Sequence, residues 1–294
     1  MKGIILAGGA GSRLYPLTLV ASKQLQPVYD KPMVYYALTT LIEGGIRDLC
    51  LISTPADVPR FRQLLGDGSR FGVTIEYREQ PQPDGIAQAF LIAESFIGQD
   101  AVALILGDNL FHGADGLRKY FAAFTGGAGI FSYHVNDPER YGVLEFDPAG
   151  KIIGIEEKPK SPKSNYVVSG LYLFDRQVCA FAHSLKPSAR GELEITDLIV
   201  AYWKAGQLHH LPLPRGFAWL DTGTGSSLHD AGAYVQTVEK RNGIKIGCPE
   251  EAALQSGFLT PARLAELAAK LPVCEYRAYL EKVVTEAKLI PRRE

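Results

Sequence analysis

The sequence predicts an α/β fold, in which a doubly wound, mostly parallel sheet is extended by antiparallel strands and followed by a small helical appendage. Three observations support this prediction. Short apolar runs alternate with helical patterns through the first half of the 294 residues, which is typical of a parallel sheet with helices on both faces. Strand-like runs then dominate from Tyr141 to about Leu220. Beyond His229 the strand signal fades, and apolar residues recur at helical spacing.

The first half of the chain supplies the parallel part of the predicted sheet. The apolar runs that we interpret as strands cover residues 2–6, 49–53, 73–77, 101–106 and 130–135. The helical patterns between them cover residues 33–43, 58–65, 86–96 and 117–124. Because such sheets bind ligands at the carboxyl ends of their strands, we expect the functional residues in the turns that follow these runs.

The second half is expected to extend this sheet and to form a second substrate site. Its strand-like runs cover residues 142–146, 152–155, 167–174 and 208–213, and a helical pattern interrupts them at residues 196–205. In the C-terminal part, Thr260 is the predicted N-cap and Pro261 the first residue of a helix. We therefore expect a core over residues 1–228 and a helical region over residues 229–294.

Composition favours a compact protein with a small-molecule ligand. The chain is 46% hydrophobic and 21% charged, and its net charge of −1 gives no overall attraction to nucleic acid or to a membrane surface. The four cysteines are scattered without a C-x-x-C pair, so we expect reduced thiols. No apolar run reaches membrane-spanning length, and the first strand leaves no room for a signal peptide, which predicts a cytoplasmic location.

A glycine-rich turn follows the first predicted strand. Gly8, Gly9 and Gly11 leave backbone N–H groups free to face phosphate oxygens, and Arg13 adds a forked cation. A plain strand-to-helix turn remains the alternative at this point. The P-loop pattern fails because no Gly-Lys-Ser/Thr follows, and the dinucleotide fingerprint fails because Leu14 stands where glycine is required.

Two carboxylates emerge at the ends of apolar segments. Asp108 follows the run at residues 101–106, and Asp221 follows Trp219 and Leu220. Magnesium is commonly held by one or two carboxylates together with substrate phosphates, so both residues are candidate ligands. A role in a turn or a helix cap is an equally good interpretation of either aspartate alone.

Other polar residues are candidates for binding. Lys23 follows the glycine turn closely enough to reach the same phosphates, and Lys158 could bind the phosphate of an acceptor, with Glu157 on a sugar hydroxyl. The loop at residues 80–85 carries amides suited to a base edge. Taken singly, Lys23 is more typical of a solvated surface, Glu157 and Lys158 are more typical of an exposed β-turn, and the loop is equally suited to an ordinary connection. The sequence has neither a histidine or thiolate cluster with metal-ligand spacing nor a G-x-S-x-G elbow for a covalent nucleophile.

Taken together, these segments resemble the sugar-nucleotide pyrophosphorylases over essentially the whole chain. The segments that carry the resemblance are LAGGAGSRLYP at residues 6–16, SKQLQPVYDKPMVYY at 22–36, QPDGIAQAF at 82–90, LGDNLFHG at 106–113, ERYGVLEFD at 139–147, EEKP at 156–159, RGELEITD at 190–197 and WLDTGT at 219–224. The first segment and EEKP mark the whole superfamily. The second, third and seventh point to its thymidylyltransferase branch.

The resemblance implies a set of site residues. Those implied on the nucleotide are Gly8, Gly11, Ser12, Arg13, Lys23, Gln24, Gln80, Gly85 and Asp108, with Gln80 and Gly85 on the thymine. Those implied on the sugar phosphate are Tyr141, Gly142, Glu157, Lys158 and Val168. Asp108 and Asp221 would hold Mg²⁺, and Arg13, Lys23 and Lys158 would be the catalytic cations. Ser12 stands where threonine is frequent, and Gln26 interrupts the usual leucine pair.

The resemblance also implies organisation and regulation. Residues 141–228 would form the sugar-phosphate part of the core, and residues 229–294 would contribute subunit contacts in a homotetramer. A second nucleotide-sugar site for feedback would involve residues 243–251 and the C-terminal helices. The tail differs from the usual glycine-tyrosine-glycine pattern, because Glu275 and Arg277 flank Tyr276.

The implied reaction transfers a thymidylyl group from dTTP to glucose 1-phosphate, giving dTDP-glucose and pyrophosphate for deoxysugar synthesis such as that of dTDP-rhamnose, a precursor of polysaccharides. The same reaction with UTP is the nearest alternative, because a methyl group is worth only about 1 kcal/mol of discrimination in an apolar pocket. A non-catalytic nucleotide-sugar sensor is a second alternative. A sensor would have no need for the metal and leaving-group residues, and a dehydrogenase is disfavoured by the failed dinucleotide fingerprint.

Overall fold

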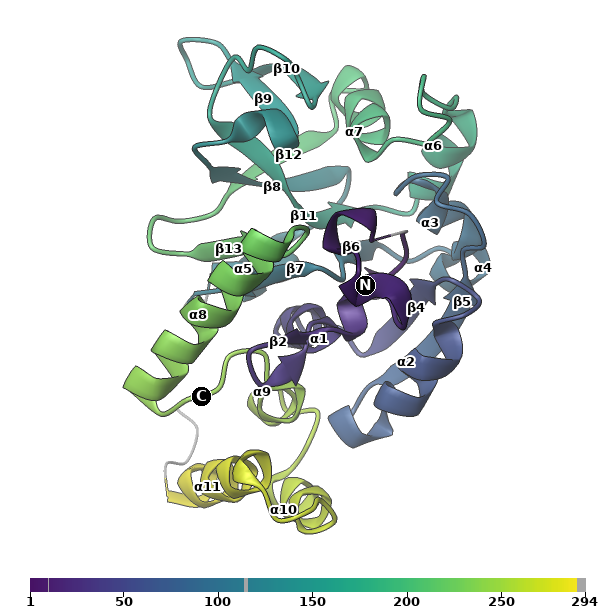
Figure 1. Ribbon diagram of the computed structural model, residues 1–294. Coiled ribbons are helices and arrows are strands. Elements are labelled where there is room, and N and C mark those ends of the chain that lie inside the picture. Colours follow the sequence, from purple (N-terminus) through teal and green to yellow (C-terminus); the bar gives the residue numbers. More distant parts are fainter. Residues whose placement is uncertain (10, 114–115, 290–294) are drawn as a thin grey trace.

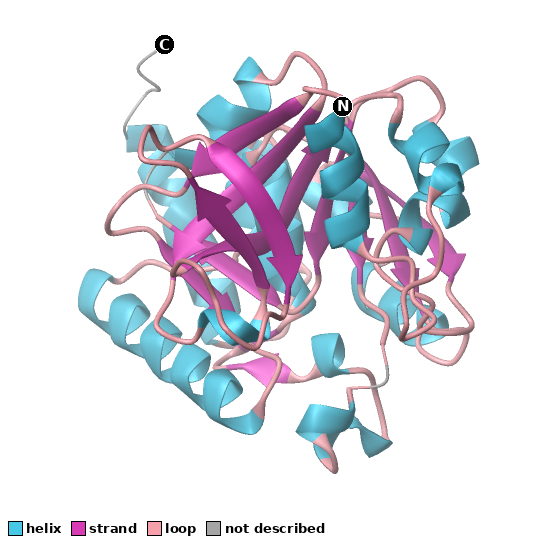
Figure 2. Ribbon diagram, turned by 90° about the horizontal axis from the view of Figure 1, so that it is seen from above, coloured by secondary structure: helices cyan, strands magenta, loops and turns pink. Residues whose placement is uncertain are grey.

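The computed structural model describes residues 1–9, 11–113 and 116–289, and these form a three-layer α/β structure (Figure 1). Among them, nine strands build one sheet, with a continuous order of β10-β9-β11-β6-β1-β4-β5, while β8 pairs with β11 and β12 pairs with β8. Helices cover both faces of this sheet (Figure 2). The predicted fold class is therefore confirmed.

The strands of the main sheet and of two small ribbons have these bounds: β1 Lys2–Leu6, β2 Pro27–Val28, β3 Lys31–Pro32, β4 Asp48–Ser53, β5 Thr74–Glu79, β6 Val102–Leu106, β7 Asn109–His112, β8 Ala128–His134, β9 Gly142–Phe146, β10 Ile152–Glu157, β11 Tyr166–Phe174, β12 Leu208–Pro212 and β13 Ala218–Asp221. The helices have these bounds: α1 Val34–Glu43, α2 Val58–Leu65, α3 Gln88–Ile92, α4 Glu94–Ile97, α5 Gly116–Ala123, α6 Val178–Ser184, α7 Ile195–Lys204, α8 Gly225–Asn242, α9 Pro249–Gln255, α10 Pro261–Ala269 and α11 Glu275–Leu289.

The parallel part of the sheet forms from the first half of the chain, as predicted. β1 lies between β4 and β6 and is parallel to both, and β5 continues the parallel order beyond β4. Successive residues of a strand face opposite sides, so Ile4 belongs to one buried cluster and Ile5 to the other. Helix α1 packs on the face that carries Ile5, whereas α3 and α7 pack on the face that carries Ile4.

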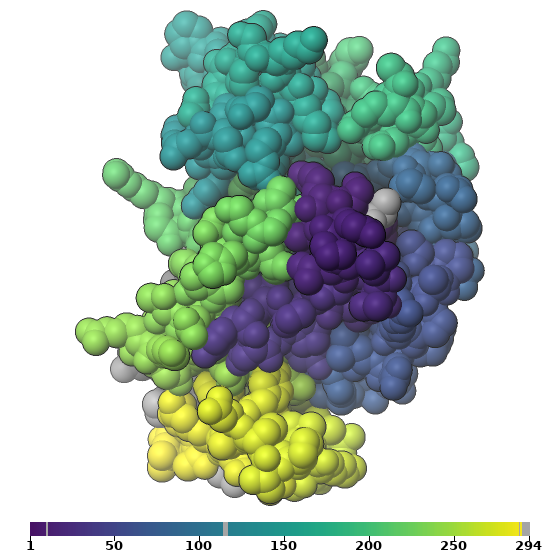
Figure 3. Space-filling model, in the orientation of Figure 1, coloured from purple at the N-terminus to yellow at the C-terminus, as the bar shows by residue number. Residues whose placement is uncertain are grey.

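The second half extends the sheet, also as predicted. β11 is antiparallel to β6, β8 and β9, and β9 is antiparallel to β10. β12 returns parallel to β8. This extension lies at one end of the molecule, opposite α10 and α11 (Figures 1 and 3).

Two details differ from the predicted elements. The helix expected at residues 86–96 is two short helices, because the backbone of Ala93 (φ −93°, ψ 8°) leaves the helical conformation between α3 and α4. Strands β7 and β13, which pair antiparallel, were not predicted as strands. Their shortness and lack of alternation concealed them.

The C-terminal region is helical in the part that the structure describes. The expected boundary at residue 228 falls inside α8, and residues 290–294 of the expected region lie outside the described residues. Thr260 caps α10 by accepting a hydrogen bond from the Arg263 N–H at 3.2 Å, and Pro261 begins the helix, as predicted. The four cysteines are free thiols, and only Cys274 is exposed. No helix within the described ranges is long and apolar enough to cross a membrane.

Candidate active site

The glycine-rich turn leaves the sheet at the carboxyl end of β1. Gly11 adopts a left-handed conformation (φ 58°), and a Cβ at this position would lie 2.7 Å from Cγ2 of Thr18. Thr18 Oγ1 donates a hydrogen bond to the Gly11 carbonyl oxygen at 3.1 Å, which ties the turn to the segment that follows it. Ala10 of this turn lies outside the described residues. Ser12 and Arg13 follow on a short 3₁₀ helix with exposed side chains.

The two candidate metal ligands lie side by side. Asp108 connects β6 to β7, and Asp221 ends β13 directly opposite Asn109. The backbone N–H of Thr222 donates to the Asp108 carbonyl oxygen at 3.1 Å, and the Thr222 hydroxyl donates to the same oxygen at 2.7 Å. Asp108 and Asp221 are 113 positions apart in the sequence. The pairing of the backbone beside them brings their two carboxylates to one place.

Cations surround this pair of carboxylates. Lys23 forms an ion pair with Asp108, and both side chains are largely buried. Burial alone would raise the pKa of the Asp108 carboxyl, but the charge and the hydrogen bond of Lys23 help to lower it below its ordinary value. Burial, followed by the nearby charge of Asp108, raises the pKa of Asp221. The two buried carboxylates therefore differ, because Lys23 pairs directly with Asp108, whereas burial dominates at Asp221.

Arg13 approaches the same carboxylates from the glycine turn. A Cβ on Gly223 would lie 2.9 Å from a terminal guanidinium nitrogen of Arg13 and 3.0 Å from Oδ1 of Asp221. The guanidinium therefore lies over Gly223, close to Asp221, and its charge opposes the rise in the pKa of that carboxyl. The turn, Arg13, Lys23 and both carboxylates meet at the carboxyl ends of β1 and β6, where such sheets bind their ligands.

The amides expected on the base lie beside the glycine turn. Gln80 is buried, and its Nε2 donates to the Gly85 carbonyl oxygen at 3.2 Å and to Oε1 of Gln88 at 2.7 Å. A Cβ on Gly8 would lie 3.1 Å from Oε1 of Gln80, so this amide touches the turn. Gly85 has φ 106°, and a Cβ there would lie 2.3 Å from the Leu193 carbonyl oxygen. Only glycine fits at this position.

Gln24 contacts the backbone of the glycine turn with its side chain. Its side chain is buried, and its Nε2 donates to the Gly8 carbonyl oxygen at 3.3 Å. Its Oε1 is buried without a hydrogen-bond partner among the described residues. A buried acceptor without a partner is costly, which makes this oxygen a candidate to accept a hydrogen bond from a bound group.

The residues expected on the sugar phosphate gather around the start of β9 and the end of β10. The Lys158 N–H donates to the Tyr141 carbonyl oxygen at 2.9 Å, and Lys158 Nζ lies 3.0 Å from Oε1 of Glu157. The Thr196 hydroxyl donates to Oε2 of Glu157 at 2.6 Å, and a Cβ on Gly142 would lie 3.4 Å from that oxygen. Val168 lies in β11 beside them and is buried.

Tyr141 links this side to the carboxylates. Its hydroxyl donates to Oδ2 of Asp221 at 3.4 Å, and its ring meets Trp219 edge-on at 5.2 Å. The structure therefore brings the residues expected on the nucleotide, the metal and the sugar phosphate into one continuous region. Lys158, at φ 46°, adopts a conformation that is unusual for a residue other than glycine, and its ammonium is half exposed.

Comparison with known proteins identifies the family. The model of a family described as nucleotidyl transferase matches residues 2–238, which is most of the chain. The chain belongs to the nucleotidyl transferase family. It is thus an enzyme of that family, as the resemblance implied.

Named relatives agree with this assignment. The chain is 54% identical over 282 residues to a glucose-1-phosphate thymidylyltransferase of Xanthomonas campestris, and the match covers 95% of each chain. It is 56% identical to a protein of the same name from Mycolicibacterium smegmatis, over 95% of this chain and 98% of the relative. The branch suggested by the sequence segments is therefore the one to which these relatives belong.

Solved structures share the fold of this nucleotidyltransferase. The crystal structure of a protein from Bacillus anthracis, described as a glucose-1-phosphate thymidylyltransferase in complex with sucrose, is 46% identical, with a TM-score of 0.74 over 80% of this chain and 94% of its own. A UDP-glucose pyrophosphorylase complexed with UDP-glucose matches with a TM-score of 0.71 at 23% identity, over 80% of this chain and 98% of its own. The second likeness shows the fold alone.

The nucleotidyltransferase site also contains residues that were not singled out from the sequence. The Arg140 guanidinium lies 3.0 Å from Oδ2 of Asp221, and Arg190 lies 3.9 Å from Oε1 of Glu157. Asn109 contacts the Asp108 carboxylate. Each of these residues is adjacent to or inside a motif that carries the resemblance, which is the only signal in the sequence that would have pointed to them.

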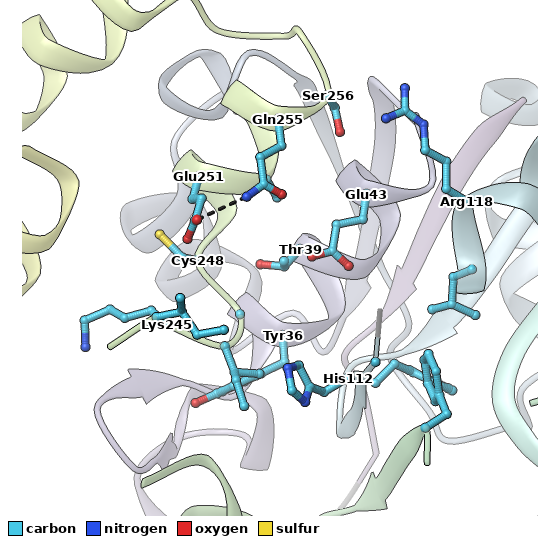
Figure 4. Close-up of a pocket in the computed structure, with 18 of the residues that line it drawn as sticks. Tyr36, Thr39, Glu43, His112, Arg118, Lys245, Cys248, Glu251, Gln255 and Ser256 are labelled. Atoms are coloured by element: carbon cyan, nitrogen blue, oxygen red, sulfur yellow. Dashed lines mark hydrogen bonds between the residues drawn. The ribbon is translucent and has the colours of Figure 1, made fainter. Parts of the chain in front are cut away.

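A separate cavity of about 520 Å³ lies on the α1 and α9 side of the nucleotidyltransferase core (Figure 4). Tyr36, Thr39 and Glu43 line it from α1, and Glu251 and Gln255 line it from α9 (Figure 4). Residues 244–248 also line it, so the cavity includes most of the segment expected to form the second site.

Proposed function

We propose that this nucleotidyltransferase transfers a thymidylyl group from dTTP to glucose 1-phosphate, giving dTDP-glucose and pyrophosphate. The observation that carries the proposal is the meeting of Arg13, Lys23, Asp108 and Asp221 beside the open glycine turn. Two cations and two carboxylates beside free backbone N–H groups suit a triphosphate with its counter-ion. The names of the relatives support the choice of substrates.

Mg²⁺ fits the carboxylate pair. Asp108, directly before β7, and Asp221, at the end of β13, would supply oxygen ligands from one end of the β7–β13 ribbon, and burial followed by the charge of Asp108 raises the pKa of Asp221. When bound there, Mg²⁺ would neutralise phosphate charge. The described residues hold no group of three or more His, Cys, Asp or Glu side chains that could bind a metal, so substrate oxygens and water would complete the coordination of Mg²⁺.

The remaining residues hold the two substrates. Gly8, Gly11 and Ser12 would bind the phosphates, Gln24 would support them, and Gln80 with Gly85 would meet the base. Lys158 would bind the sugar phosphate, and Glu157, fixed by the Thr196 hydroxyl, would accept a hydrogen bond from a sugar hydroxyl. Tyr141, Gly142 and Val168 would form the walls around the sugar.

The reaction itself requires no covalent intermediate on the protein. A phosphate oxygen of the sugar phosphate attacks the α-phosphorus of dTTP, the bond from that phosphorus to the bridging oxygen breaks, and pyrophosphate leaves with the electron pair. Lys158 brings the attacking anion close, and Arg13 with Lys23 stabilises the charge that develops on pyrophosphate. Positioning and charge neutralisation therefore account for the catalysis.

The test of this function is pyrophosphate release from glucose 1-phosphate and Mg²⁺ with one nucleoside triphosphate supplied at a time. Release is expected to be fastest with dTTP, followed by UTP, because the two bases share a hydrogen-bonding edge and differ by one methyl group. Release with another triphosphate alone would overturn the base selection. Absence of release with all five common triphosphates would favour the nucleotide-sugar sensor.

We also propose that the cavity between α1 and α9 is a second nucleotide-sugar site used for feedback. β7 supports this proposal, because it begins at Asn109 beside the carboxylates and ends at His112 in the cavity wall. Binding of dTDP-glucose to an Asp108→Asn enzyme is expected to persist and to fall at least about tenfold when Gln255→Trp fills the cavity. Complete loss of binding in Asp108→Asn alone would contradict a second site.

Assembly as a homotetramer and a role in dTDP-rhamnose synthesis remain predictions of the family resemblance, and a cytoplasmic location remains a prediction from the apolar runs and the first strand of the sequence. The division into a core over residues 1–228 and a regulatory region over residues 229–294 is likewise a proposal. Light scattering of the purified protein would measure the oligomeric state directly.

A further inference from the structure

The side chain of Asn109 lies at the centre of the carboxylate site but has no role in the proposed function so far. It is the first residue of β7, only 4% of it is exposed, and it lies opposite Asp221 across the β7–β13 ribbon. Its Nδ2 donates to Oδ1 of Asp108 at 3.2 Å. The Asn109 amide therefore contacts Asp108, one candidate metal ligand. It does so from β7, the strand that pairs with β13, which carries the other candidate ligand, Asp221.

Trp219 determines which way this amide faces. The indole Nε1–H of Trp219 donates to Oδ1 of Asn109 at 2.6 Å. Because an indole nitrogen is a donor only, the atom that faces it must be the amide oxygen, and the NH₂ group must face Asp108. Trp219 is buried and is held in turn by edge-on contacts with Tyr133 and Tyr141.

Gly170 provides the space that the amide occupies. A Cβ at residue 170 would lie 2.5 Å from Oδ1, 2.6 Å from Cγ and 2.8 Å from Nδ2 of Asn109. The backbone of Gly170 has no positive φ, so its conformation does not require glycine, whereas the contact does. The pairing of β11 with β8 shifts register between Val168 and Tyr172, which brackets this glycine. The missing Cβ of Gly170 thus leaves the space that the Asn109 amide fills.

The consequence for Asp108 concerns the direction of its carboxylate oxygens. Lys23 contacts Oδ2 and Asn109 contacts Oδ1, so both oxygens are held from the protein side. A carboxylate has about four lone-pair directions, so it can accept these contacts and the hydrogen bond from its own backbone N–H and still ligate a cation shared with Asp221. Oriented hydrogen bonds of this kind commonly change metal affinity by about 10–100-fold.

We propose that Asn109 is a positioning residue that fixes the Asp108 carboxylate for binding a divalent cation, with Trp219 and Gly170 fixing Asn109. The inference rests on the proposed function at one point, the role of Asp108 as a metal ligand. It extends that function because Asn109 and Gly170 would act through Asp108, without touching the metal or the reacting atoms.

The test measures binding of Mn²⁺ alone, by electron paramagnetic resonance of the free ion, to the full chain without nucleotide. All proteins carry Trp203→Phe, so that fluorescence reports Trp219 only. Asn109→Ala is expected to weaken Mn²⁺ binding about 10–100-fold and to change the emission of Trp219. Gly170→Ala is expected to do the same, because its methyl group displaces the amide without removing any polar group.

A double variant separates positioning from general damage. If Gly170→Ala acts through Asn109, then Gly170→Ala/Asn109→Ala binds Mn²⁺ as Asn109→Ala does, and the two losses do not add. Gly154→Ala is the matched control, because Gly154 also lies in a strand and its added Cβ would meet only a flexible Glu145 carboxylate, at 2.9 Å. This control is expected to leave both Mn²⁺ binding and Trp219 emission unchanged.

Asp108→Asn distinguishes the two ways in which the proposal could fail. If Asp108→Asn loses Mn²⁺ binding while Asn109→Ala and Gly170→Ala keep it, the positioning role is overturned and the metal role of Asp108 stands. If Asp108→Asn keeps Mn²⁺ binding, the metal role fails and the inference fails with it. A fall in melting temperature of Asn109→Ala with unchanged Mn²⁺ affinity would show that the amide is merely structural.

Discussion

Replacing Arg13 with alanine is expected to lower turnover about 1,000-fold while changing the affinity for glucose 1-phosphate by less than about threefold. The guanidinium lies over Gly223 beside Asp221, at the opening of the glycine turn, whereas Lys158 serves the sugar phosphate. In the proposed reaction, negative charge accumulates on the departing pyrophosphate. Arg13 therefore stabilises the transition state more than it stabilises bound sugar phosphate.

The measurement is steady-state pyrophosphate release over a matrix of dTTP and glucose 1-phosphate concentrations. Arg13→Lys is expected to retain part of the turnover, because it keeps the charge but loses the forked geometry. Arg263→Ala is the control, since Arg263 pairs with Glu266 on the exposed face of α10. Near-normal turnover of Arg13→Ala would remove this residue from the mechanism, and a loss confined to the KM of glucose 1-phosphate would move it to the other substrate.

The sequence was most informative where chemistry and backbone geometry reinforce each other. Alternating strand and helix patterns predicted the parallel core, because each buried strand needs a continuous apolar run between turn residues. The glycine turn could be recognised because Gly11 needs a positive φ, and Asp108 because a carboxylate directly after a buried strand is conspicuous. These signals are local, so they can be interpreted without knowing the tertiary structure.

The residues that were missed depend on contacts between distant segments. β7 and β13 are four residues each. They are strands only because they pair with one another, although more than 100 residues separate them in the sequence. Asn109 gains its significance from Trp219 and Gly170, and Arg140 from Asp221. Neither periodicity nor propensity records such pairings, so the sequence drew attention to Asp108 and Asp221 but not to the residues that contact them.

A buried cluster of charges joins the segments on either side of the expected domain boundary, and it too was not foreseen. Lys31 of β3 is 2% exposed and lies 2.8 Å from Oε1 of Glu239 in α8. Lys245 lies 3.3 Å from the other oxygen of Glu239, and both lysines also pair with Asp30. The Ile246 N–H donates to Glu239 Oε1 at 2.9 Å. The cluster therefore connects the β2–β3 ribbon, α8 and the segment that lines the second cavity.

Replacing Lys31 with methionine is expected to lower the free energy of unfolding by about 3 kcal/mol. Methionine fills a similar volume, so the loss comes from leaving Glu239 buried with only Lys245 as its cationic partner. For a chain of this length, the change corresponds to a fall of about 6 °C in melting temperature. Chemical unfolding followed by circular dichroism measures the free energy directly.

Two further variants test whether the burial of Glu239 causes the loss of stability in Lys31→Met. Lys163→Met removes an exposed partner of Glu145 at 3.1 Å, and it is expected to cost less than about 1 kcal/mol. Lys31→Met/Glu239→Gln is expected to recover part of the loss, because glutamine buries no charge and its oxygen still accepts from the Ile246 N–H. Equal losses in Lys31→Met and Lys163→Met would show that the buried cluster adds nothing to stability. A double variant less stable than Lys31→Met would show that Glu239 stabilises the fold without needing Lys31.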